Sequence, residues 1–347
     1  MKAILRKLQQ VQNDVNPGIP ILICIDIEPD ERAIDPRVRA DWPGFEKSYE
    51  FFSVLRQRLE IATGSPVHFS WFLRMDPQVT HVYGSPDWVV TRYPHLIEAL
   101  AAAGDELGLH THAWRWDENC QEWIEDFGDQ RWVDHCVRSS FEAFHTSLNR
   151  PCKSFRFGDH WTNDQTVDLL EEQGAKFDLT VEPGATGTLV PGESFTGTFP
   201  DYTQIPQVPY RPHKNDFRKR SFWRKRDLWI IPISAGSTAS TTTSPTTSPW
   251  RRWTARPASH QNSTPEYMSL ILSFDPPTFS SIANRLLGDL RRPYLALPAR
   301  TDMAHEPYQR FNLERNIEYL LSHPLIKDFV FETPGEAIKR LNPSGVL

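Results

Sequence analysis

Two short segments of the chain carry side chains that could bind a metal ion together. Asp26 and Glu28 stand at the end of an apolar run typical of a buried strand, and His110 and His112 end another strand-like segment. Residues two apart in an extended strand point to the same side, so each pair presents its side chains together. Two imidazoles in this arrangement favour chelation of one divalent ion, with bonds of about 2.0–2.1 Å.

The acid pair could also have a purely structural role. A buried carboxylate needs a partner, so Asp26 and Glu28 could instead cap the next element or pair with an arginine. A third segment supplies such an arginine, because Arg156 lies in the sequence Phe-Arg-Phe-Gly at residues 155–158. An arginine beside a carboxylate orients it and holds it ionised, and Gly158 permits close approach of the backbone.

The segments that carry these residues alternate with helix patterns. Strand patterns cover residues 20–27, 67–73, 106–112, 154–157 and 176–181, and helix patterns cover residues 45–62, 94–103, 129–148 and 163–173. This alternation predicts an α/β fold with a parallel sheet or barrel, in which functional residues gather at the carboxyl ends of the strands.

The second half of the chain is less regular. Residues 183–228 are rich in Pro, Gly and Thr without a periodic element, and the Ser/Thr/Pro tract at residues 237–248 is typical of a surface loop. Further strand patterns cover residues 228–233, 294–297 and 328–331, and helix patterns cover residues 308–323 and 335–341. The predicted organisation is an extension (1–18), one domain (19–341) with an irregular insertion (183–262), and a tail (342–347).

The overall charge argues against nucleic acid as a partner. With 38 basic and 44 acidic residues the net charge is -6, so no strong basic field attracts nucleic acid or anionic lipid. One local exception is the run RKRSFWRKR at residues 218–226, which could contact phosphate groups or could be a solvated loop. The 12 Trp residues could line a sugar site or pack the core.

The N-terminus and the cysteines indicate a soluble cytoplasmic protein. The 4 Cys residues include no Cys-x-x-Cys pair and suit a reducing compartment. The basic N-terminal segment is followed by no apolar stretch of the kind found in signal peptides. The apolar run at residues 19–27 is too short for a transmembrane segment, and the sequence leaves the oligomeric state open.

The ordered set of motifs resembles the polysaccharide deacetylase family, the carbohydrate esterases with a NodB-homology domain. Asp26 and Glu28 match the acid motif that ends the family's first strand, GLHTHAW at residues 108–114 resembles its His-rich motif, and FRFG resembles its Arg-Gly motif. Further segments fit a divergent His-x-His subgroup: HFSWFLRMD at 68–76, VPYRP at 208–212, LWIIPI at 228–233 and FETPGEAI at 331–338.

The resemblance implies a NodB-like fold, a deformed (β/α)7-type barrel, and a hydrolase. Such an enzyme removes an acetyl group from a sugar or glycoconjugate by attack of a metal-bound water. The implied cofactor is a divalent metal, usually zinc, held by Glu28, His110 and His112. Asp26 would be the general base, and Arg156 would orient it.

The chain differs from the family pattern in three places, the first of which is Glu28, where the usual acid motif has a second Asp. The family's second motif places its histidines four residues apart, but residue 114 is Trp, so we expect His112 to be the second imidazole ligand. The late Leu-x-His motif that supplies the general acid is not evident, and we expect His305 in that role, with His160 or His213 as alternatives. The residues expected to contact the substrate are Trp114, Trp161, Tyr210 and Arg300.

Two other functions fit the same residues. A catalytically degenerate relative could use the fold to bind a glycan or a protein partner. A different metal-dependent hydrolase, of amidohydrolase or phosphoesterase type, could also use a His-x-His motif. Those enzymes usually carry the motif on their first strand, whereas here it falls on about the third, after an acid pair. A cytoplasmic acetylated sugar or glycoconjugate precursor is therefore the expected substrate.

Overall fold

The computed structural model of the chain describes seven ranges of residues. These are 18–31, 34–187, 195–223, 226–237, 267–289, 293–304 and 306–342. The Ser/Thr/Pro tract predicted at residues 237–248 lies outside them apart from Ser237, as does most of the extension predicted at residues 1–18.

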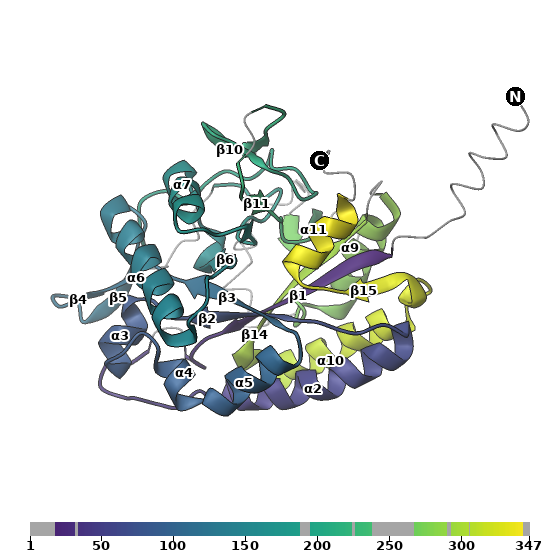
Figure 1. Ribbon diagram of the computed structural model, residues 1–347, viewed down its shortest axis with the longest axis horizontal. Coiled ribbons are helices and arrows are strands. Elements are labelled where there is room, and N and C mark those ends of the chain that lie inside the picture. The colour runs from purple at the N-terminus through teal and green to yellow at the C-terminus, as the bar shows by residue number, and fades with distance from the viewer. Residues whose placement is uncertain are drawn as a thin grey trace, which may run out of the picture.

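A parallel, curled sheet forms the centre of the molecule (Figure 1). Its strands are, in spatial order, β11 (Trp229–Ile230), β7 (Phe177–Asp178), β6 (Ser154–Phe157), β3 (Glu106–Thr111), β2 (Ser70–Arg74), β1 (Ile19–Ile27) and β14 (Leu295–Arg300). A further strand, β15 (Phe329–Phe331), pairs with the first residues of β1. Within the described ranges no ladder joins β11 to β14, so the sheet is an open half-barrel. The predicted α/β, deformed barrel fold is confirmed.

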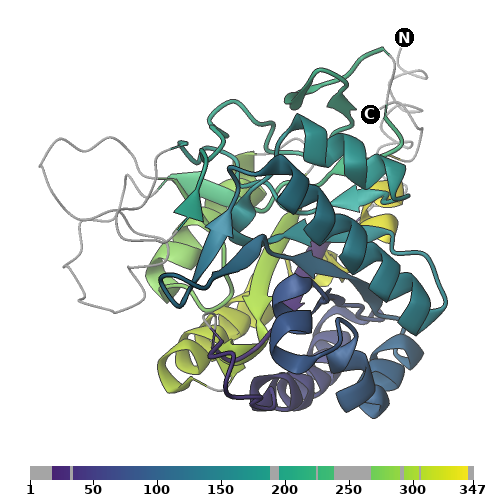
Figure 2. The same cartoon turned by 90° about the vertical axis from the view of Figure 1, so that its left-hand side faces the viewer.

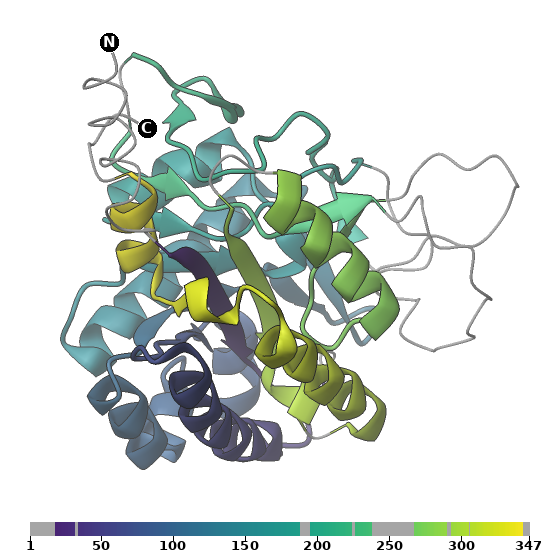
Figure 3. The same cartoon turned by 90° about the vertical axis from the view of Figure 1, so that its right-hand side faces the viewer.

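Helices cover the outer side of the sheet. They are α2 (Pro43–Thr63), α5 (Pro94–Ala102), α6 (Gln130–Leu148), α7 (Asp164–Glu172), α9 (Pro276–Asp289) and α10 (Pro307–Ser322). α11 (Pro334–Leu341) packs against the other face of the sheet, where its apolar side chains contact the cluster that contains Leu22 and Cys24. Figure 3 shows α9, α10 and α2 following one another along one side. Every residue of β1 is buried, as expected for a central parallel strand that is covered on both faces.

Several short elements were not predicted. They are the helices α3 (Pro77–Tyr83) and α4 (Trp88–Arg92), and the strands β4 (Trp114–Asp117), β5 (Glu122–Asp126), β8 (Phe195–Thr196), β9 (Pro212–His213), β10 (Asp216–Arg220), β12 (Ala235–Ser237) and β13 (Tyr267–Ser269). The hairpin of β4 and β5 lies at the left of Figure 1 and faces the viewer in Figure 2. Where the sequence indicated no periodic element, β8, β9 and β10 form very short ladders.

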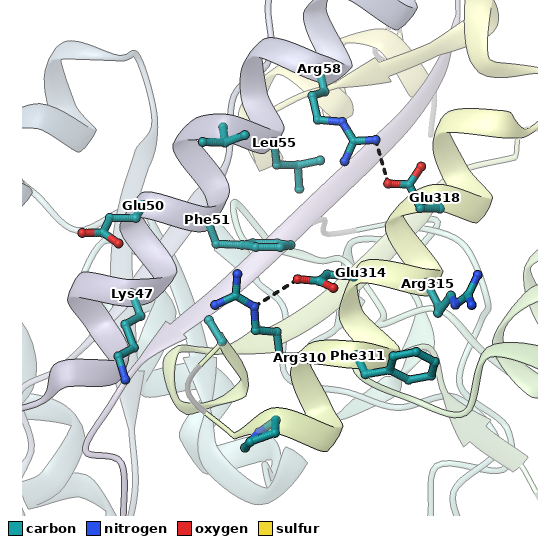
Figure 4. Close-up of a pocket in the computed structure, with 13 residues that line it drawn as sticks. Lys47, Glu50, Phe51, Leu55, Arg58, Arg310, Phe311, Glu314, Arg315 and Glu318 are labelled. Atoms are coloured by element: carbon teal, nitrogen blue, oxygen red, sulfur yellow. Dashed lines mark hydrogen bonds and ion pairs between the residues drawn. The ribbon is translucent and has the colours of Figure 1, made fainter.

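A groove runs between α2 and α10 on the outer surface (Figure 4). Its volume is about 1140 Å³, and Phe51 lies in it. Arg58 and Glu318 form an ion pair of 2.6 Å across it. None of the residues that line the groove belongs to the sequence motifs, so the groove is separate from the candidate site.

Candidate metal centre

The two predicted pairs meet at the carboxyl ends of β1 and β3. Asp26 is the penultimate residue of β1 and Glu28 follows the strand, while His110 lies at the end of β3 and His112 just after it. All four side chains are buried, with exposed fractions of only 3–4%. Such burial of two acids and two imidazoles requires that their polar atoms find partners within the site.

Three of these residues direct one atom each to a common point. Oε2 of Glu28 lies 3.8 Å from Nε2 of His110 and 3.8 Å from Nε2 of His112, and the two Nε2 atoms are 3.1 Å apart. Ligand atoms around a tetrahedral zinc ion lie about 3.3 Å apart when the bonds are about 2.0 Å. The three atoms therefore have the spacing expected for ligands of one ion.

Hydrogen bonds at the other ring nitrogens select the tautomers of the two imidazoles. Nδ1 of His110 lies 3.2 Å from the carbonyl oxygen of Arg156, so it must carry the proton and donate it. Nδ1 of His112 lies 2.8 Å from Oε1 of Glu125 and 3.0 Å from Oδ2 of Asp159, two further acceptors. Both Nε2 atoms then carry lone pairs, as metal ligation requires.

The residues present fit a divalent cation. Two Nε2 lone pairs 3.1 Å apart repel each other unless a positive charge lies between them. The charges around the site also leave an excess of negative charge. The carboxylates at the site are Asp26, Glu28, Asp76, Glu125, Asp159 and Asp302, and the guanidiniums are Arg74, Arg156 and Arg300.

The surroundings shift the two imidazoles in opposite directions. Burial, followed by the positive charges of His112 and Arg74, lowers the pKa of His110 well below its usual value, so this ring is neutral. Burial and Arg74 also act to lower the pKa of His112, but Asp159 and Glu125 outweigh them and raise it. A metal ion at Nε2 of His112 would therefore replace a proton that this ring otherwise holds.

Asp26 lies beside the three converging atoms and has a different environment. Its Oδ2 accepts a hydrogen bond of 2.9 Å from Nε of Arg156, and its Oδ1 has no hydrogen-bond partner among the described residues. Burial raises its pKa to about 6, although Arg156 acts to lower it. A buried carboxylate with one open oxygen and a raised pKa is suited to accept a proton.

Two arginines contact the two carboxylate oxygens of Glu28. Nε of Arg300 lies 2.7 Å from Oε1 of Glu28, and Nη1 of the fully buried Arg74 lies 3.3 Å from Oε2. Arg74 is fixed in turn by Asp76, whose Oδ2 lies 2.6 Å from its Nε and also accepts a hydrogen bond from the backbone of His112. Glu28 therefore has a single orientation, with Oε2 toward the imidazoles.

Sequence reasoning missed Arg74, Asp76, Glu125 and Asp159. Arg74 and Asp76 lie in the segment HFSWFLRMD, whose pattern indicated a strand but no role for either side chain. Asp159 follows the Arg-Gly motif directly, so its proximity to the site could have been inferred. Glu125 reaches His112 through the unpredicted hairpin, and no sequence signal indicated it.

The backbone after β6 is shaped to accommodate the ring of His112. A Cβ atom on Gly158 would lie 2.2–2.3 Å from three ring atoms of His112, so only glycine fits there. The next two residues, Asp159 and His160, both adopt left-handed φ values of 52° and 56°. This uncommon conformation directs Asp159 to the imidazole, and strained backbone of this kind is frequent at functional sites.

The residues predicted to contact a substrate lie in different places. Trp114 is stacked beside His112 with ring centroids 6.2 Å apart, and Arg300 is bound to Glu28. Trp161 packs on Phe127 close to the site but is only 3% exposed. Tyr210 is completely buried, and its hydroxyl donates to the carbonyl oxygen of Phe217, so the structure does not bring it to the centre.

Of the three residues predicted as general acids, the structure describes His160 and His213. His305 lies outside the described residues. His160 is half-buried near the site with Nδ1 3.2 Å from the carbonyl oxygen of Thr180, and His213 is exposed on β9. The acid that follows β14 is instead Asp302, which pairs with Arg300 and whose pKa burial raises to about 6.

Comparisons with known proteins identify the fold of this chain. No protein-family model matches the chain, and no curated protein matches it. Among the helices within the described ranges, none has both the length and the apolar composition needed to cross a membrane.

Solved structures match almost the whole chain. A probable polysaccharide deacetylase from Pseudomonas aeruginosa PAO1 superposes with a TM-score of 0.52 at 14% identity, over 95% of this chain and 93% of that one. PuuE allantoinase superposes with a TM-score of 0.51 at 15% identity, over 96% of this chain and 93% of that one. At such low identity the likeness concerns the fold, which is that of the NodB-like polysaccharide deacetylases.

Proposed function

We propose that this chain is a metal-dependent hydrolase that removes an acetyl group from a sugar or glycoconjugate. The observation that carries the proposal is the convergence of Glu28, His110 and His112 on one point, with Asp26 beside them. The fold shared with a probable polysaccharide deacetylase supports the substrate class. Membership of a His-x-His subgroup of that family and a cytoplasmic precursor as substrate are part of the proposal. The first rests on the sequence motifs, and the second rests on the cysteine pattern.

Each residue of the site has a separate role in the proposed reaction. A divalent ion held by Glu28, His110 and His112, with zinc as the first choice for this donor set, supplies Lewis acidity toward water and the acetyl oxygen. Asp26 accepts the proton of the attacking water at Oδ1, while Arg156 holds Oδ2. The bond between the acetyl carbon and the nitrogen or oxygen of the sugar then breaks, and the leaving amine or hydroxyl takes up the proton that Asp26 accepted. Arg300, whose side chain is 21% exposed, contacts the substrate.

The variant Asp26→Asn tests this division. Asn keeps the shape and the bond from Arg156 but cannot accept a proton, so we expect acetate release to fall by about 10²–10⁴-fold. Metal content should stay at the wild-type level, because Asp26 is not among the converging ligands. The exposed Glu314→Gln is the control, and wild-type activity in Asp26→Asn would contradict the role of Asp26.

A second candidate function is that of a related amidohydrolase, which the similarity to PuuE allantoinase favours. The same residues would then cleave a C–N bond in a small molecule other than an acetylated sugar. Parallel assays with acetylated sugars and with small cyclic amides separate the two. A protein that binds the metal and hydrolyses neither would be the degenerate, glycan- or partner-binding relative.

A further inference from the structure

The segment between β10 and β11 is anchored at Ser221 and at Arg226, and residues 224 and 225 between them lie outside the described ranges. The backbone amide of Ser221 donates to the carbonyl oxygen of Arg211 at 2.9 Å. At the other end Arg226 is only 1% exposed, and its guanidinium contacts Glu171 at 3.1 Å and the carbonyl oxygen of Lys214 at 2.8 Å. Ser221, directly before the aromatic pair, and Arg226, three residues after it, are therefore both bound to the body of the protein.

Two aromatic side chains of this segment are exposed to solvent. Phe222 is 75% exposed and Trp223 is 85% exposed, which makes Trp223 the most exposed large hydrophobic side chain of the described residues. Two adjacent exposed aromatics beside an anchored residue are unusual for a protein surface and mark sites of interaction. Trp in particular is enriched where a protein meets the interface of a bilayer, because its ring is apolar and its N–H is polar.

Basic side chains accompany the aromatic pair. β10 contributes Arg218, Lys219 and Arg220, and the guanidinium of Arg220 lies 5.7 Å from the ring centre of Phe222. Asp216 pairs with Arg218 and Lys219 at 2.9 Å each, so the strand keeps a net positive charge. This patch contrasts with the chain as a whole, whose net charge is -6.

The patch is separate from the metal centre. The loop directly precedes β11, so it lies at the amino ends of the parallel strands, whereas the metal centre lies at their carboxyl ends. Figure 1 shows β10 at the top of the molecule, beyond α7. A role of this loop is therefore independent of the proposed catalytic function.

We propose that this loop docks the protein on an anionic lipid surface, with Phe222 and Trp223 entering the headgroup region and Arg218, Lys219 and Arg220 facing lipid phosphates. Aromatic insertion combined with a few cations is the usual composition of peripheral membrane contacts. Nucleic acid would favour a longer row of cations than this strand offers. The two projecting aromatics therefore favour the bilayer.

Sedimentation with vesicles tests the proposal. Full-length protein is mixed with vesicles of phosphatidylcholine alone or with one-quarter phosphatidylglycerol. We expect binding to the anionic vesicles only, weakened by salt, and a loss of at least tenfold in Phe222→Ala/Trp223→Ala. The matched control is Ile61→Ala, which removes an equally exposed apolar side chain from α2 and should bind like wild type.

A second variant separates charge from apolar insertion. Lys219→Glu keeps both aromatics and should reduce binding to anionic vesicles several-fold. Metal content and thermal unfolding should be unchanged in all variants, since the loop lies away from the metal centre. Absence of wild-type binding, equal binding by the double variant, or tighter binding to single-stranded DNA than to vesicles would overturn the proposal.

Discussion

The orientation of His112 depends on two carboxylates that approach its Nδ1 atom. Glu125 and Asp159 come from different elements, at 2.8 Å and 3.0 Å, and together they keep the proton on Nδ1. This leaves the lone pair of Nε2 directed toward Glu28 and His110. Such partners behind a metal ligand usually contribute as much to affinity as the geometry of the ligand itself.

Removal of Glu125 should therefore weaken metal binding without removing a ligand. We expect Glu125→Ala to bind zinc about 10–100-fold more weakly than wild type, measured by competition with a chelating dye. The control Glu122→Ala changes an exposed residue of the same strand and should have no effect. Wild-type affinity in Glu125→Ala would show that Glu125 has no part in orienting His112.

The buried carboxyl of Asp178, which is not among the predicted metal ligands, should make the stability of the fold depend on pH. Burial raises its pKa from 3.8 to about 6 in the fold, while Thr180 donates two hydrogen bonds to Oδ1. A carboxyl whose pKa is higher in the folded state stabilises the fold below pH 4, and this contribution is lost as the pH rises through 6. The loss is about 3 kcal/mol.

The variant Asp178→Asn keeps the acceptor for Thr180 but cannot ionise. Between pH 4 and 7 its free energy of unfolding should fall less than that of wild type, and above pH 6 it should be the more stable protein. Chemical denaturation at several pH values measures both. Asp26 and Asp302 titrate in both proteins, so identical pH profiles would mean that Asp178 does not titrate as described.

Among the elements, the β4–β5 hairpin has the greatest consequence for the site because it carries Glu125. Arg115 of β4 ties it to α6, with Nη2 2.9 Å from Oδ2 of Asp129 and its guanidinium over the ring of Trp132. Asp129 is also the N-cap of α6 and accepts hydrogen bonds from the backbone amides of Arg131 and Trp132. One residue thus serves both the helix and the hairpin.

Loss of this cap should lower stability by a measurable amount. We expect Asp129→Ala to reduce the free energy of unfolding by about 1 kcal/mol, because the first turn of α6 loses its acceptor. Asp129→Asn keeps the cap and loses only the half-exposed ion pair with Arg115, so it should lose less stability than Asp129→Ala in the same denaturation experiment. Equal stability of all three proteins would mean that the cap contributes nothing.

Most long apolar or amphipathic segments were predicted, whereas α9 and the short irregular elements were not. β1, β3 and β6 were predicted within one residue, because continuous apolar runs in a parallel sheet leave a clear pattern. The strand expected at residues 176–181 is only Phe177–Asp178, since its neighbour β11 offers just two paired residues. The β4–β5 hairpin turns at Gln121, and its two strands are only four and five residues long, which is too short to leave a clear pattern.

At the scale of the whole molecule, chain topology decided which site residues could be found. Residues at the ends of predicted parallel strands, such as Asp26, His110 and Arg156, had to meet at one edge of the sheet. Glu125 reaches that edge through a hairpin, and its position does not follow from a strand pattern. Tyr210 is the opposite case. It belongs to the motif VPYRP, but its side chain is buried and does not reach the metal centre.

The central claim is a metal ion bound by His110 and His112, and elemental analysis of the purified protein tests it most directly. Wild type should contain about one divalent ion per chain, and His110→Ala/His112→Ala should contain none. The control His95→Ala/His145→Ala removes two exposed imidazoles and should keep the ion. Metal-free wild type after reconstitution with zinc, or an ion retained by the His110/His112 variant, would contradict the account.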